Sequence, residues 1–109
     1  MLDERQIAKI LVVDDEPAAR VSLAEILRLE GHHVLTAASG EEALRVLAQE
    51  ARVNLVMLDI RMPGMDGLEV LQAIHAESAN TVVVLLTGFG TLDTAIEAMR
   101  HGAHDYLLK

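Results

Sequence analysis

Five residues that carry oxygen or nitrogen groups stand directly after short apolar runs of the sequence. Asp14 and Asp15 follow the first run, Asp59 the third, Thr87 the fourth and Lys109 the fifth. Two carboxylates about 4 Å apart repel each other by about 4 kcal/mol at an effective dielectric near 20, so three of them at one place require a cation. A hydroxyl and an ammonium nearby would bind phosphoryl oxygens, and an Asp carboxylate can act as a nucleophile. Gathered together, these residues would suit phosphoryl transfer.

The metal expected at such a cluster is a hard divalent cation. Its ligands would all be oxygens, because no His or Cys lies near the three acids and the chain has no cysteine. Oxygen ligands favour Mg²⁺, with Mn²⁺ or Ca²⁺ as alternatives. Taken singly, the same residues have ordinary structural readings: Asp15 as the cap of a helix starting at Pro17, and Asp59 as part of a turn.

Apolar runs and amphipathic stretches alternate along the chain, and this alternation predicts strands and helices. The continuous, branched runs are typical of parallel strands buried on both faces. Pro17 and Gly31 would begin and end the first helix, and Ser39 with Glu42 forms a capping box for the second. The expected strands are Lys9–Val13, Val34–Ala37, Leu55–Leu58, Val82–Leu86 and Tyr106–Leu108, and the third and fourth helices are Gly67–Ala76 and Thr91–Arg100.

This order of elements predicts an α/β fold: a flavodoxin-like, doubly wound, five-stranded parallel sheet of order 2-1-3-4-5. In such sheets ligands bind beyond the carboxyl ends of the strands, where the winding direction reverses. For this order the reversal lies between the first and third strands. Asp14, Asp15 and Asp59 end those two strands and should therefore converge.

Composition excludes several functions. One hundred and nine residues suffice for one domain, taken as residues 1–109. The net charge is −8 and no basic run is present, which argues against direct binding of nucleic acid. No stretch approaches the roughly 20 apolar residues needed to span a membrane, and the N-terminus does not read as a secretory signal. A soluble, cytoplasmic domain is expected.

Four motifs together resemble the receiver domain of two-component response regulators. They occur in order and at family spacing from about residue 8 to the end of the chain. Their last part is most similar to receivers of the enhancer-binding, AAA+ regulator class. The motifs are Asp14-Asp15 after an apolar strand, the ten residues Leu58–Gly67, Leu86-Thr87-Gly88, and Asp105–Lys109.

The resemblance implies a role for each matching residue. Asp59 would be the phosphoacceptor, Asp15 a direct Mg²⁺ ligand, Asp14 a largely water-mediated one, and the Arg61 backbone carbonyl a further ligand. Thr87 and Lys109 would bind the phosphoryl group, and Tyr106 would change rotamer with Thr87. Two further residues lie where water must enter, Arg61 two positions beyond Asp59 and Phe89 two beyond Thr87, and they are expected to modulate the lifetime of the phosphoryl group.

The implied function is a switch rather than an enzyme that turns over. A sensor histidine kinase would supply the phosphoryl group, and the domain would catalyse its own phosphorylation and slow dephosphorylation. A transcriptional output domain or a second receiver would bind the face around the fourth helix and fifth strand. Receivers have a fifth helix after the Lys, so this chain is expected to be C-terminally incomplete, with the sheet face beside the first helix partly bare.

Two alternatives compete with the switch. A small aspartyl-phosphate phosphatase or phosphotransferase would need a second acid to activate water and a cap over the substrate, and neither is evident. A flavodoxin-like mononucleotide binder would need a Ser, Thr or Gly loop after the first strand to hold a phosphate. Asp14, Asp15 and Glu16 stand there instead and would repel it.

Overall fold

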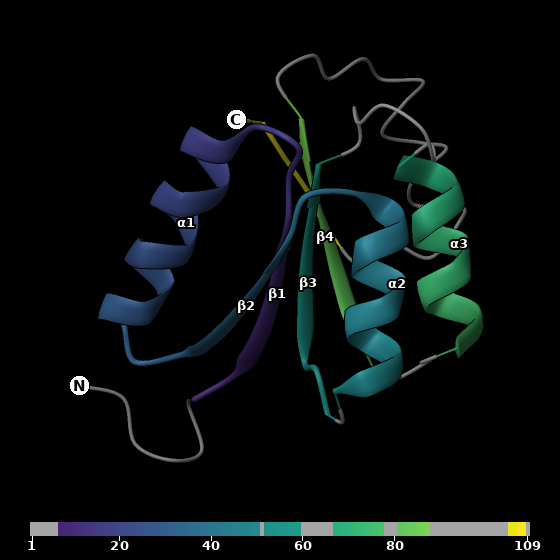
Figure 1. The fold of residues 1–109 in the computed structure, drawn as a ribbon, viewed down its shortest axis with the longest axis horizontal. Helices are drawn as coiled ribbons and strands as arrows, with labels where there is room; N and C mark the ends of the chain where they lie inside the picture. The colour runs from purple at the N-terminus through teal and green to yellow at the C-terminus, as the bar shows by residue number, and fades with distance from the viewer. Residues whose placement is uncertain (1–6, 51, 60–66, 78–80, 88–104, 109) are drawn as a thin grey trace.

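The computed structural model describes residues 7–50, 52–59, 67–77, 81–87 and 105–108. Five parallel strands form one sheet of order β2-β1-β3-β4-β5, which confirms the predicted topology. The strands are β1 Lys9–Val13, β2 His33–Ala37, β3 Leu55–Asp59, β4 Val82–Thr87 and β5 Asp105–Leu108, and the described helices are α1 Pro17–Leu29, α2 Gly40–Gln49 and α3 Gly67–Glu77. Helix α1 covers one face of the sheet, and α2 and α3 cover the other (Figure 1).

Helix α1 begins and ends where the sequence indicates. Pro17 occupies the first helical position, where its missing N–H costs no hydrogen bond. At the other end Gly31 has a φ of 100°, a conformation that a residue with a Cβ adopts only at a cost. The Gly31 N–H donates to the Arg28 carbonyl and the His32 N–H to the Leu27 carbonyl, the paired bonds of a Schellman motif. This stop directs the chain into β2.

Helix α2 starts at the predicted cap, Ser39, although the Glu42 carboxylate binds the backbone one residue before the cap rather than at the cap itself. The Ser39 hydroxyl accepts a hydrogen bond from the Glu42 N–H at 3.1 Å, and a Glu42 carboxylate oxygen accepts one from the Ala38 N–H at 3.0 Å. Two backbone donors at the helix start are thereby satisfied. The cap fixes the path from β2 into α2.

Replacing Ser39 by Ala should destabilise the domain by about 1 kcal/mol, the usual cost of losing an N-cap side chain. Chemical denaturation followed by circular dichroism measures the change. Ser22→Ala is the matched control: Ser22 lies exposed inside α1, where Ala is the better helix former, so stability should stay the same or rise slightly. Equal losses in both variants would contradict a capping role for Ser39.

The sheet separates two apolar cores, as expected for strands buried on both faces. Alternate residues of β1 point to opposite sides: Leu11 and Val13 toward α2 and α3, and Ile10 and Val12 toward α1. The larger core also contains Val56 and Leu58 of β3, Val83 and Leu85 of β4, and Val70, Leu71 and Ile74 of α3. Because β1 is buried on both sides, the acids at its end are held on a rigid strand.

The two faces of the sheet are covered unequally. On the side of α2 and α3, Val56, Leu58, Val83 and Leu85 are almost fully buried. On the α1 side, the alternate residues of the same two strands, Leu55, Met57, Val82 and Val84, are only half-buried. On the described strands β3 and β4, the α1 side is therefore the less fully covered of the two.

One minor interpretation of the sequence needs correction. The N-cap of α1 is Glu16, and no side chain caps it, so the alternative in which Asp15 is the helix cap is wrong. Shortly after α1, His32 is half-buried, and its Nδ1 accepts a hydrogen bond from the Ala8 N–H at 3.0 Å. The expected helix Thr91–Arg100 lies outside the described residues.

Candidate functional site: an acidic cluster at the carboxyl edge of the sheet

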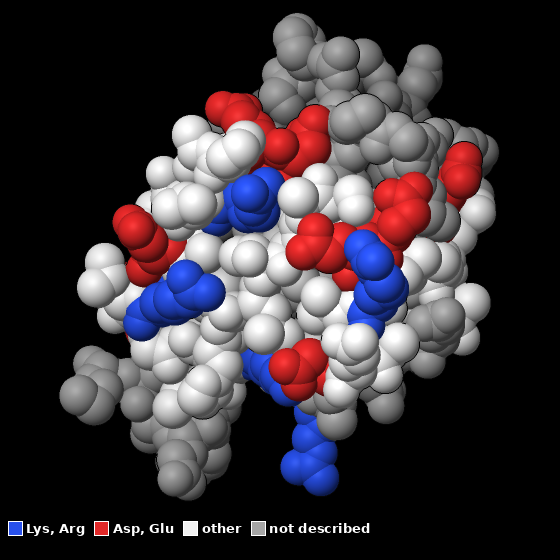
Figure 2. All heavy atoms as spheres, in the orientation of Figure 1, with Lys and Arg blue, Asp and Glu red and all other residues white. Residues whose placement is uncertain are grey.

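Asp14, Asp15 and Asp59 converge at the carboxyl ends of β1 and β3. Each offers a carboxylate oxygen, and these oxygens all lie within 4.8 Å of one another. The convergence follows from the pairing of the strands, because Val13 lies opposite Leu58 and the acids are the next residues on each strand. Figure 2 shows acidic side chains gathered at the top of the molecule, where β1 and β3 end in Figure 1. The sequence-based prediction of this convergence is confirmed.

Several hydrogen bonds anchor Asp14. It is 2% exposed, and its N–H donates to the Ala37 carbonyl at the end of β2. One of its carboxylate oxygens, Oδ1, accepts a hydrogen bond from the Glu16 N–H at 2.9 Å. Its carbonyl accepts a hydrogen bond from the Arg20 guanidinium at 3.0 Å. These contacts tie the residue to both β2 and α1.

Asp59 and Asp15 differ in their access to solvent. Asp59 is the last residue of β3 and is 5% exposed, whereas Asp15 lies on the turn leading into α1 and is more exposed than either of the other acids. Burying a carboxylate is costly unless hydrogen bonds or opposite charges compensate it. The arrangement therefore offers two carboxylates held inside the site and one at its rim.

Thr87 is placed at the same edge by its backbone. It is the last residue of β4 and lies opposite Leu108 of β5, while Asp59 lies opposite Leu86. Tyr106 belongs to β5, where its backbone lies opposite Leu85. The remaining predicted site residues, Arg61, Phe89 and Lys109, lie outside the described residues.

Arg20 is a participant that the sequence-based interpretation missed. Its backbone N–H bonds to the Glu16 carbonyl in the first turn of α1, and its guanidinium reaches back to the carbonyl of Asp14. A signal was present, because side chains in an α-helix lean toward its N-terminus and Pro17 sets the start of this one. An Arg in the first turn after two acids can therefore reach the turn that carries them.

The cluster fits a small divalent cation. Mg²⁺ binds oxygens at about 2.0–2.1 Å, so two ligands on opposite sides of one ion lie about 4 Å apart. The three carboxylates offer oxygens within 4.8 Å of one another, and none of the three residues supplies nitrogen or sulfur. A hard, oxygen-binding ion suits this donor set best.

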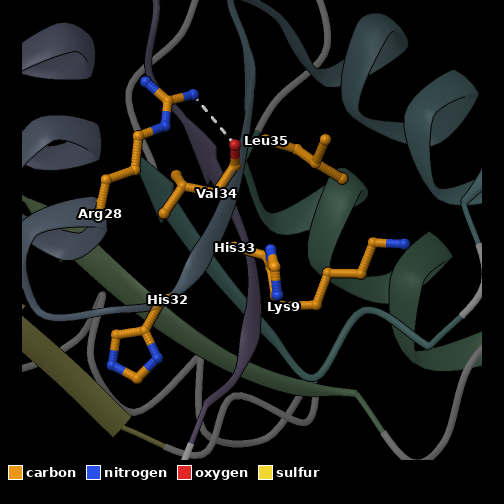
Figure 3. Close-up of a pocket in the computed structure, with 6 residues that line it drawn as sticks. All are labelled: Lys9, Arg28, His32, His33, Val34 and Leu35. Atoms are coloured by element: carbon orange, nitrogen blue, oxygen red, sulfur yellow. Dashed lines mark hydrogen bonds between the residues drawn. The ribbon is translucent and has the colours of Figure 1, made fainter. Parts of the chain in front are cut away.

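A second hollow lies at the opposite edge of the sheet, where β1 and β2 begin. It is lined by Lys9, Arg28, His32, His33, Val34 and Leu35 (Figure 3). Two of its charged groups already have partners: Lys9 pairs with Glu50 at 3.1 Å, and Arg28 donates to the Val34 carbonyl of the same hollow at 3.0 Å. In Figure 3 the Lys9 and Arg28 side chains point away from each other. They do not form a common binding site.

Within the described parts of the chain, no helix is long and apolar enough to cross a membrane.

Comparison with known proteins agrees with this geometry. Residues 10–109 match the family model of the response regulator receiver domain. The chain is 47% identical over 102 residues to the response regulator protein FleR of Pseudomonas aeruginosa. This match covers 94% of the chain but only 21% of FleR. It is 39% identical over 101 residues to the sporulation initiation phosphotransferase F of Bacillus subtilis, covering 93% of this chain and 81% of that protein.

A solved structure shows the same fold. The response regulator TrrA of Thermotoga maritima, crystallised in complex with Mg²⁺ and BeF, superposes with a TM-score of 0.84 at 39% identity. The match covers 94% of this chain and 87% of TrrA. With the sheet order, the acidic cluster and the family match in agreement, this chain belongs to the response regulator receiver domain family.

Proposed function

We propose that this domain accepts a phosphoryl group on Asp59 with the help of a divalent cation and thereby acts as a signalling switch. The observation that carries the proposal is the convergence of Asp14, Asp15 and Asp59 within 4.8 Å at the carboxyl edge of the sheet. Asp59 is the natural nucleophile, because it ends β3, a strand buried between two cores, and is itself 5% exposed. A carboxylate fixed in this way loses little freedom when it reacts.

The proposed cation is Mg²⁺, with Mn²⁺ as a substitute. It would neutralise the carboxylates and the phosphoryl oxygens during transfer. Asp15 is proposed as a direct ligand, because it is the more exposed of the acids on this turn. Asp14 is proposed to act largely through water, since its Oδ1 already accepts the Glu16 N–H. The Arg61 backbone carbonyl, outside the described residues, is proposed as a further ligand.

The chemical step forms one bond and breaks one. An oxygen of the Asp59 carboxylate attacks phosphorus, and the bond from phosphorus to a nitrogen of phosphohistidine breaks. The electron pair of that bond returns to the imidazole, and Asp59 becomes an acyl phosphate. The Thr87 hydroxyl and the Lys109 ammonium are proposed to bind the phosphoryl oxygens. Thr87 is the last residue of β4, and Lys109 comes directly after β5 in the sequence.

The remaining residues are assigned to signal output and lifetime. Tyr106 is proposed to change rotamer when Thr87 moves toward the phosphoryl group. Two residues outside the described parts of the chain are proposed to modulate the lifetime of the acyl phosphate, Phe89 by limiting the entry of water and Arg61 by holding the phosphoryl oxygens.

The proposed partners are a sensor histidine kinase, which donates the phosphoryl group, and an output domain or a second receiver. The chain spans about a fifth of FleR and of the regulatory protein AtoC of Escherichia coli, so a transcriptional output domain of the enhancer-binding AAA+ class belongs to this proposal. Binding is assigned to the face around β5 and the expected fourth helix, which lies outside the described residues. A cytoplasmic location suits a chain without cysteine, and the net charge of −8 argues against direct contact with nucleic acid.

The proposal is tested by incubating the protein with acetyl phosphate in the presence of Mg²⁺, of Mn²⁺, or of excess chelator. Labelling should approach one phosphoryl group per chain with either metal and fall to background with chelator. Released phosphate is measured in the same samples. Sustained release at many turnovers per chain would favour the phosphatase alternative, and undiminished labelling in chelator would contradict the metal site.

A further inference from the structure

Arg20 holds the peptide group that joins the two acids of the β1–α1 turn. Its Nη1 donates to the carbonyl oxygen of Asp14 at 3.0 Å. That carbonyl and the N–H of Asp15 belong to one planar peptide unit. Fixing the direction of the carbonyl therefore fixes the direction in which the chain continues to Asp15. One acid is thus directed inward and the next toward the rim.

Two further contacts of this turn have backbone N–H donors. The Asp14 N–H donates to the Ala37 carbonyl, and the Glu16 N–H donates to Asp14 Oδ1. Of these three contacts, the Arg20 guanidinium provides the only one made by a side chain of α1. This contact connects the turn to the start of α1. The hydrogen bond from the Arg20 N–H to the Glu16 carbonyl, the first of the helix, lies beside it.

The guanidinium contacts a carbonyl rather than a carboxylate. Among the described residues it forms no ion pair, and the ion pair found there joins Lys9 to Glu50. The Arg20 guanidinium therefore does not bind a carboxylate oxygen of the cluster, while its positive charge offsets part of the mutual repulsion of the acids. A hydrogen bond from a charged donor is about twice as strong as a neutral one.

We propose that Arg20 is a positioning residue of the metal site: by holding the Asp14 carbonyl, it keeps the carboxylates of Asp14 and Asp15 in the arrangement that binds the cation. This inference rests on the metal site proposed above. Outer-shell groups that orient metal ligands commonly change metal affinity about 10- to 100-fold when they are removed. Arg20 is such a group, acting through the backbone of its neighbours.

Removing Arg20 has two opposite effects on the affinity for Mg²⁺. Loss of the hydrogen bond would loosen the acids and weaken Mg²⁺ binding. Loss of the positive charge would reduce repulsion of the cation and tighten it. We expect the loss of positioning to outweigh the loss of charge, so that the affinity for Mg²⁺ falls.

The chain offers a closely matched control. Arg28 lies on the same helix, and its guanidinium also donates to a backbone carbonyl six residues away at 3.0 Å, that of Val34 (Figure 3). This bond is at the opposite edge of the sheet. Arg28→Met therefore removes the same kind of interaction without touching the acidic turn.

The experiment compares the parent with Arg20→Met, Arg20→Lys and Arg28→Met by calorimetric Mg²⁺ titration. We expect Arg20→Met to weaken Mg²⁺ binding about tenfold. Arg20→Lys should recover most of the affinity, because Lys keeps a charged donor on a long stem. Arg28→Met should bind Mg²⁺ like the parent.

A second measurement uses the metal-free protein. Exchange of the Glu16 amide hydrogen, followed by NMR, reports on the bond from this amide to Asp14 Oδ1. Exchange should be about tenfold faster in Arg20→Met and unchanged in Arg28→Met. Unchanged or tighter Mg²⁺ binding in Arg20→Met would overturn the proposal, as would an equal loss in Arg28→Met. Failure of the parent to bind Mg²⁺ would instead overturn the metal site itself and, with it, this inference.

Discussion

Replacing Asp59 by Asn is expected to abolish covalent labelling by acetyl phosphate. The amide of Asn has nearly the shape of the carboxylate but is not a nucleophile toward phosphorus. Asp59 ends β3 and is 5% exposed, so an isosteric side chain should be accommodated without rearrangement of the strand. The loss should therefore be complete while the circular dichroism spectrum stays that of the parent. Intact-protein mass spectrometry measures the label.

A matched control separates this effect from a general loss of negative charge. Glu41→Gln makes the same kind of change at an exposed position in the first turn of α2, at an acid that is not one of the three in the cluster, and should leave labelling unchanged. Peptide mapping of the labelled parent should place the phosphoryl group on Asp59. A label on another residue, or equal labelling of Asp59→Asn, would show that the nucleophile was assigned wrongly.

Sequence patterns were sufficient to predict the convergence of the acids. The strand pattern and the order 2-1-3-4-5 place the ends of β1 and β3 side by side, and Asp14, Asp15 and Asp59 stand at those ends. Such a prediction needs only that parallel strands end at the same edge and that the winding reverses between them. Pro17 and Gly31 marked the limits of α1 for an equally local reason, the backbone geometry that each residue favours.

Contacts between side chains and backbone were harder to predict. Arg20 reaches the Asp14 carbonyl, and His32 accepts the Ala8 N–H, because turns bring these groups within hydrogen-bond distance. Neither bond follows from hydrophobic periodicity, which is averaged over many residues. Arg and His are also common on surfaces, so their residue type alone did not distinguish these contacts from solvent exposure.

Replacing either acid of the β1–α1 turn is expected to lower the affinity for Mg²⁺, and by unequal amounts. Asp14→Asn should weaken Mg²⁺ binding about tenfold, the lower range for a group that acts on the metal through water. Asp15→Asn should weaken it about tenfold more, because a direct ligand loses both its charge and an oxygen contact. The difference corresponds to about 1.4 kcal/mol. Calorimetric titration with Mg²⁺ measures both.

The structure provides the reason for this order. Asp14 Oδ1 already accepts the Glu16 N–H at 2.9 Å, so a cation that used this oxygen would compete with an existing bond. Asp15 is more exposed, and its carboxylate lies within reach of both Asp14 and Asp59. Asn at position 14 can still accept the Glu16 N–H through its side-chain oxygen. The turn should therefore stay intact in Asp14→Asn. If Asp15→Asn binds Mg²⁺ as tightly as the parent, or if Asp14→Asn is the weaker binder, the direct ligand is Asp14 and the proposed order is reversed.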